Sequence, residues 1–140
     1  MILLAVASFL LAAEPAPSPQ PSPVVVAVAG LRPTAGSHVS GEARLTAAGA
    51  KLDVTITLDG VFIPEMQYPA SIRTGGCTNA AAPLTVALRA VQEGSSRTTV
   101  ASPTVAELLR TPHSLRIMDA GGTRMLWCGE IVMPGTKRPG

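Results

Sequence analysis

The chain has 140 residues, of which 46% are hydrophobic and only 3% aromatic, and its formal net charge is +2. This length supports one domain with a modest core, so a second domain is not expected. Lys and Arg are scattered along the chain, and no basic cluster could neutralise a row of phosphates, which argues against nucleic acid as a partner.

The first 13 residues are expected to be a signal peptide. Residues 2–13 form an apolar run that is too short to cross a bilayer as a helix but has the length of a signal-peptide core. No Lys or Arg precedes this run, which departs from the usual pattern of a signal peptide. A buried N-terminal strand is the alternative. Residues 14–23 contain five prolines and are predicted to be an extended linker. The sequence therefore predicts an exported protein, periplasmic or extracellular, that meets a membrane only through its transient signal peptide.

Residues 24–133 carry the pattern of an all-β domain. The clearest strand is 51–59, where apolar residues alternate strictly with polar ones, and we expect it to form a hairpin with strand 39–47 around a turn at Gly49 and Ala50. Further strands are predicted at residues 24–29, 70–73, 84–91, 97–101, 115–119 and 124–133. Seven to eight short strands with turns every eight to twelve residues indicate an antiparallel Greek-key β-sandwich or barrel.

Three smaller features complete the prediction for this domain. A short helix is expected after the strand 97–101, with Pro103 at its first position and with Thr104 and Glu107 as a capping box. The core is expected to be aliphatic, built around Phe62, Tyr68 and Trp127. A disordered tail is expected at residues 134–140.

Cys77 and Cys128 are the only cysteines in the chain. Two cysteines in an exported domain of this size are more often paired than free, so we predict a structural disulfide in preference to a cysteine nucleophile. The bridge would enclose about 52 residues, and the loss of chain entropy in the unfolded state would then be worth about 4 kcal/mol. It would be the largest single constraint in the domain.

The segments around the two cysteines carry a resemblance to a known family. Gly76-Cys77-Thr78-Asn79 and, much later, Leu126-Trp127-Cys128-Gly129 make the chain similar to copper/zinc superoxide dismutases and their short secreted relatives. In that family a Gly-Cys-Thr loop is disulfide-bonded to a Cys-Gly near the start of the last strand. The resemblance extends over residues 24–133 and implies an immunoglobulin-like, superoxide dismutase-like β-domain with a bond between Cys77 and Cys128.

The metal-binding histidines of the family are replaced in this chain. Ser71 and Arg73 stand at the expected His-Xaa-His pair, Leu84 near the expected bridging histidine, and Met118 at the last copper histidine. Copper chemistry needs several neutral nitrogen donors on one ion, and Arg73 would instead bring a permanent positive charge. The sequence therefore predicts a pseudoenzyme with no metal and no catalytic residue.

The resemblance also implies a geometry. Ser71, Arg73 and Met118 should lie close together, because the family brings these strands side by side around its metal. Arg73 should then turn to solvent or pair with a carboxylate such as Asp119 or Glu130, since an unpaired buried guanidinium is costly.

Two classes of function remain open. The first is a non-catalytic domain with a binding or structural role, whose partner is an unknown protein or envelope component and which could form a homodimer. The alternative is a copper- or zinc-binding protein, or a superoxide dismutase-related enzyme, with a metal site rebuilt from histidines and methionines. We expect His38 and His113 to lie in surface loops. Core packing is expected for the methionines considered as soft ligands, which are Met66, Met118, Met125 and Met133.

Overall fold

The computed structural model describes residues 25–34 and 39–135 of the chain. Over these residues the elements are β1 (Val25–Pro33), β2 (Gly41–Ala48), β3 (Lys51–Leu58), β4 (Gln67–Thr74), β5 (Leu84–Gln92), β6 (Ser95–Val100), α1 (Val105–Arg110), β7 (His113–Met118) and β8 (Met125–Val132). The predicted signal peptide (1–13), linker (14–23), His38 and the tail residues 136–140 lie outside the described residues.

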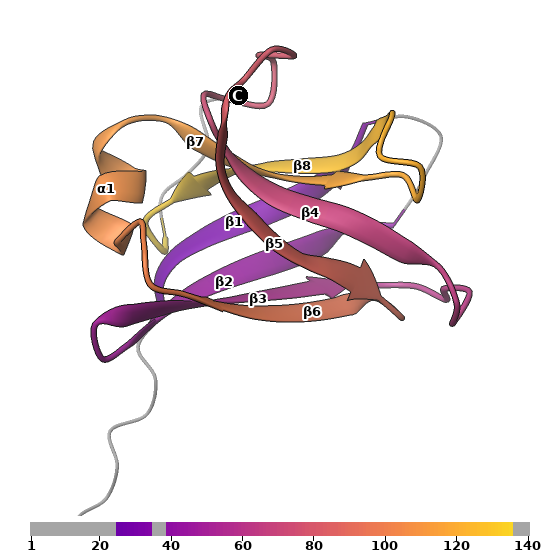
Figure 1. Cartoon of the computed structure of the whole chain (residues 1–140), viewed down its shortest axis with the longest axis horizontal. Helices are drawn as coiled ribbons and strands as arrows, with labels where there is room; N and C mark the ends of the chain where they lie inside the picture. Colours follow the sequence, from indigo (N-terminus) through magenta and orange to yellow (C-terminus); the bar gives the residue numbers. More distant parts are fainter. Residues whose placement is uncertain (1–24, 35–38, 136–140) are drawn as a thin grey trace, which may run out of the picture.

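The strands close into an antiparallel barrel in the order β1-β2-β3-β6-β5-β4-β7-β8 (Figure 1). The chain passes from β3 to β4, and β5 and β6 then fill the space between them, which makes the connection a Greek key. The expected all-β Greek-key fold with one short helix is therefore confirmed, and its strands form a closed barrel.

Two tight hairpins set the register of the barrel. Ala48 pairs with Lys51 across a turn in which Gly49 has a φ of 64°, a conformation that favours glycine. The apolar residues of β3 are buried as the alternation predicted. In the second hairpin Gln92 pairs with Ser95, so the turn needs only two residues and β6 begins two residues earlier than predicted.

Several expected boundaries were wrong: β4 begins at Gln67 and β7 at His113, each earlier than predicted, and β1 and α1 also differ. Strand β1 continues past Ala29 to Pro33, because β2 and β8 pair with it on both sides and extend the ladder. Thr104 is the N-cap of α1 and forms the predicted capping box with Glu107, so Pro103 precedes the cap and the first helical residue is Val105. No helix in the described ranges is long and apolar enough to cross a bilayer.

The barrel interior is aliphatic, and three aromatic rings pack together beside it, as predicted. Trp127 is buried, and its ring centroid lies 5.9 Å from that of Tyr68 and 6.2 Å from that of Phe62, with edge-on geometry. The indole Nε1 of Trp127 donates a hydrogen bond to the carbonyl of Val39 at 2.9 Å. Helix α1 lies at one end of the barrel (Figure 1), where its Leu108 is fully buried.

The barrel closes where β1 pairs with β8, and Gly129 permits this closure. A Cβ atom at position 129 would lie 2.5 Å from the backbone carbonyl oxygen of Gly30. Because that neighbour is backbone and cannot rotate away, only glycine fits at this position. The Cys-Gly pair at residues 128 and 129 thus has a packing role as well as a covalent one.

Candidate functional site

The predicted disulfide between Cys77 and Cys128 is confirmed, with a Cα–Cα distance of 5.9 Å. Cys77 belongs to the connection between β4 and β5, residues 75–83, which we call the cystine loop and which projects at the top of Figure 1. Cys128 is on β8, which is separated from β4 by β7 in the barrel order. The disulfide therefore draws the cystine loop across the outside of β7.

Polar side chains lie beneath the cystine loop, on the outer face of β4 and β7. Ser71 is paired with Arg116 and Arg73 with Ser114 across the two strands, whereas the intervening Ile72 belongs to the barrel core. Outer-face residues of a barrel are normally exposed, yet Arg116 is only 4% exposed and Ser114 is fully buried. The loop has created a second, polar buried layer outside the barrel.

Arg116 fastens the cystine loop from below. Its Nη2 donates to the backbone carbonyls of Gly76, at 2.9 Å, and of Asn79, and its Nε donates to the Ser114 hydroxyl at 3.3 Å. Burial, followed by the positive charge of Arg73, lowers the pKa of Arg116 from its ordinary value. Arg116 is thus a buried cation that is held by neutral acceptors.

Arg73 contacts the other end of the same loop. Its Nη1 donates to the carbonyl of Ala82 at 3.1 Å and its Nε donates to the Ser71 hydroxyl at 3.4 Å. The expected carboxylate partner is not found among the described residues: the half-buried side chain uses a carbonyl and a hydroxyl and keeps part of its surface in solvent. Asp119 instead accepts backbone hydrogen bonds from Thr123 and Arg124 in the β7–β8 turn, and these bonds lower its pKa.

A hollow of about 280 Å³ opens beside the two guanidiniums and is the candidate site. We call it the arginine hollow; its lining residues are Arg73, Ala80, Arg116, Met118, Thr123 and Met125. Met118 is paired with Met125 across β7 and β8, so the two thioethers form the less polar side of the hollow.

The four positions at which the resemblance expects metal-binding histidines lie on three adjacent strands. Ser71 and Arg73 are on β4, Met118 is on the neighbouring β7, and Leu84 pairs with Arg73 from β5. Leu84 is 55% exposed. The ligands available there are a hydroxyl and one thioether, beside a guanidinium, which is a permanent cation and cannot bind a metal. This set lacks the imidazoles, thiolates and carboxylates that hold zinc or copper(II), and a single thioether is not a copper(I) site.

The other candidate ligands differ from their expected settings. His113 is buried instead of lying in a surface loop, because β7 begins at this residue, and its Nδ1 donates to the carbonyls of Leu108 and Thr111. Core packing is wrong for the four methionines. Met133 follows the end of β8 and is 61% exposed, and Met66, Met118 and Met125 are half-buried and lie outside the core cluster. Across the described ranges, no three His, Cys, Asp or Glu residues are grouped so that they could hold a metal ion.

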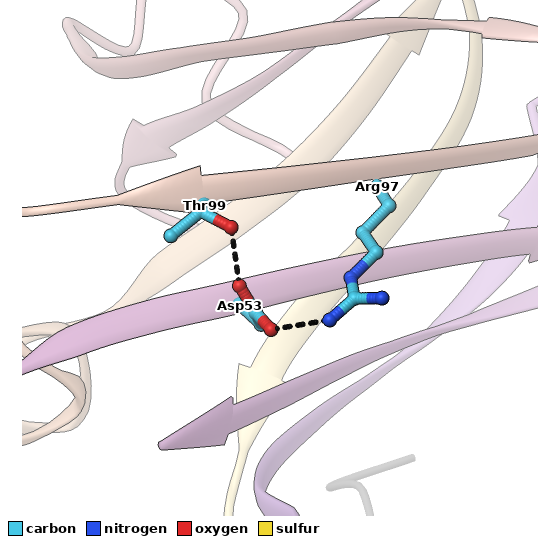
Figure 2. Close-up of polar contacts among 3 residues, drawn as sticks. All are labelled: Asp53, Arg97 and Thr99. Atoms are coloured by element: carbon cyan, nitrogen blue, oxygen red, sulfur yellow. Dashed lines mark hydrogen bonds and ion pairs between the residues drawn. The ribbon is translucent and has the colours of Figure 1, made fainter. Parts of the chain in front are cut away.

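A second polar cluster contains an arginine whose charge is neutralised by a carboxylate. Figure 2 shows Asp53 of β3 accepting hydrogen bonds from Arg97 and Thr99 of β6. The hydrogen bond from Thr99, followed by that from Arg97, lowers the pKa of Asp53. Both residues belong to the outer ladder between β3 and β6, and Arg97 is largely solvent-exposed. Asp53 itself is only 8% exposed, so this cluster is a cross-strand ion pair with a covered carboxylate, and it lines none of the hollows described for the barrel.

Together, the fold and the hollow define a disulfide-bridged, eight-stranded antiparallel β-barrel that carries a polar site beneath its cystine loop. Comparison of the sequence with protein-family models and with curated proteins finds no match to this chain. Sequence reasoning missed Arg116, because the alternation of Leu115, Arg116 and Ile117 places it on an outer face and gives no sign of the loop above.

We expect Arg116→Met to lower the free energy of unfolding by about 1 to 3 kcal/mol. The substitution removes the donors to the carbonyls of Gly76 and Asn79, and the loss of these hydrogen bonds lowers stability. We expect this loss to be larger than the stability gained by removing a buried charge. Urea denaturation measures the loss, and hydrogen exchange of the amides in residues 75–83 should become faster. Arg89→Met, at an exposed position on β5, is the matched control and should change stability by less than about 0.5 kcal/mol. Equal losses in the two variants would contradict the anchoring role.

Proposed function

We propose that this protein is an exported, non-catalytic, superoxide dismutase-like domain with a binding role, located in the periplasm or outside the cell. The observation that carries the proposal is the pair of guanidiniums, Arg73 and Arg116, at the strands where the resemblance expects copper. The disulfide supports an oxidising compartment, since such bonds persist mainly in exported proteins. The closed Greek-key barrel is the fold that the resemblance implies.

The charges in the arginine hollow oppose a metal cation. Two guanidiniums carry permanent positive charge, and the desolvated setting of Arg116 weakens the screening of its field by water. A divalent cation placed beside them would be repelled by both and would gain a thioether or a hydroxyl as its ligand. The same charges favour an anionic ligand or an acidic segment of a partner protein or envelope component.

A rebuilt copper or zinc site is the less favoured function. His113 could supply an imidazole only through Nε2, since its Nδ1 donates to two backbone carbonyls, and His113 lines a different hollow from Met118 and Met125. Met118 and Met125 could supply thioethers, but they share the hollow with both guanidiniums. The geometry therefore favours the pseudoenzyme.

Metal analysis tests the choice between these functions. The tag-free protein is incubated with copper or zinc salts and desalted, and its metal content is measured by mass spectrometry. We expect no retained equivalent in the wild-type protein. A variant that combines Ser71→His, Arg73→His, Leu84→His and Met118→His should gain affinity, because it removes one cation and adds four imidazoles. One tightly held equivalent of copper or zinc in the wild-type protein would overturn the proposed function.

A further inference from the structure

We propose that the arginine hollow binds a small oxyanion, a carboxylate or phosphate group, through Arg73 and Arg116. The inference rests on the proposed binding role and goes further by naming the chemical class of the ligand. It is carried by hydrogen-bonding capacity, by charge and by shape, which are three separate observations on the same residues.

The two guanidiniums keep unused donors at the hollow. Each guanidinium has five N–H groups. Arg116 donates through Nε and Nη2, and Arg73 through Nε and Nη1, which leaves Nη1 of Arg116 and Nη2 of Arg73 without a hydrogen-bond partner in the described part of the chain. No fully buried side-chain nitrogen or oxygen among the described residues lacks a partner, so neither nitrogen is completely sealed from solvent, although Arg116 as a whole is only 4% exposed. Both arginines line the arginine hollow, so the hollow is where we propose that an acceptor reaches both nitrogens.

Neither arginine of the hollow forms an ion pair within the described ranges; Glu130 lies against Gly76 of the cystine loop, and Asp119 accepts a hydrogen bond from Thr123. The ion pairs found there join Arg44 to Glu42 and Arg97 to Asp53, and they include neither arginine of the hollow. After burial, the repulsion from Arg73 is the second cause that lowers the pKa of Arg116. An oxyanion bound between them would relieve this repulsion and form charge-assisted hydrogen bonds, for which the planar guanidinium is well suited.

The hollow is preorganised for such a ligand. Arg116 is held by two loop carbonyls and Arg73 by a third, and the disulfide fixes that loop to β8. Binding therefore costs little ordering of side chains. The volume of about 280 Å³ accommodates a small acid, and Met118, Met125 and Ala80 offer apolar contact to a short carbon chain attached to the anionic group.

Calorimetric titration with inorganic phosphate and, separately, with acetate and butyrate tests the inference at low ionic strength and pH 7. The protein is desalted first, so that no chelator such as EDTA, which is itself a polycarboxylate, competes with the titrated anion. We expect saturable binding of one anion per chain. Arg73→Gln should weaken it by about tenfold or more, since one charge-assisted interaction is lost. Arg89→Gln removes the same charge from an exposed position on β5 that does not line the hollow, and should leave the dissociation constant within about twofold.

Each outcome decides the matter. Tighter binding of phosphate supports a phosphate-bearing ligand, and tighter binding of butyrate than of acetate supports a carboxylic acid with an apolar chain. Equal weakening in Arg73→Gln and Arg89→Gln, or no saturable binding of any of the three anions by the wild-type protein, would overturn the inference. Circular dichroism of both variants establishes that they are folded. Metal retention is measured in a separate experiment. If no anion binds, only the proposal of an oxyanion site is overturned, and the proposed metal-free binding role is unaffected. If the wild-type protein retains a metal, the proposed function itself is overturned.

Discussion

Replacing both Cys77 and Cys128 with Ser should lower the free energy of unfolding by about 2 to 4 kcal/mol. The two residues are 51 positions apart, so the bridge removes much of the conformational freedom of the unfolded chain between them. The backbone hydrogen bonds of the barrel do not depend on the disulfide, so the far-UV circular dichroism spectrum should remain unchanged. Urea denaturation of the double variant, compared with the oxidised wild-type protein, measures the difference.

Reduction provides an independent check on the disulfide prediction. Wild-type protein treated with dithiothreitol should lose a similar amount of stability, whereas the double Ser variant should not respond to the reductant. The cystine loop should also become more mobile, because Cys77 is its covalent link to β8. Titration of two reactive thiols in native, unreduced protein would refute both the bridge and the stability it is expected to provide.

Ile72→Ala should also cost about 2 to 5 kcal/mol of unfolding free energy. Ile72 is fully buried, and its strand β4 lies between β5 and β7. Truncation leaves a cavity in the barrel directly behind the face that carries Ser71 and Arg73. We therefore expect weaker anion binding as well, because the positions of the donors depend on the packing of β4. Thermal denaturation and the phosphate titration measure the two effects.

Ile63→Ala is the matched control for this substitution. The side chain removed is identical, but Ile63 is 60% exposed in the β3–β4 connection. Its loss should change stability by less than about 0.5 kcal/mol and leave anion binding unchanged. If both Ile variants lost the same stability, the assignment of Ile72 to the core would be contradicted.

The most reliable predictions from the sequence concern local features. The alternation in residues 51–59, the turn at Gly49 and the capping box of Thr104 and Glu107 each involve residues that are close in the chain, and the structure has all three. Export and the family resemblance depend on residues 1–23 and on short motifs, and remain proposals. Strand ends were less predictable, because pairing with β2 and β8 carried β1 on to Pro33.

The sequence by itself determined an all-β chain with one pair of cysteines and no histidines at the positions where the resemblance expects them. Only the tertiary structure decided that Arg116 is buried, that Arg73 binds a carbonyl instead of a carboxylate, and that both line one hollow. The physical reason is that the disulfide draws residues 75–83 across β7 and covers a face that local periodicity marks as exposed. Burial outside a barrel depends on contacts between distant segments, and no pattern of neighbouring residues encodes it.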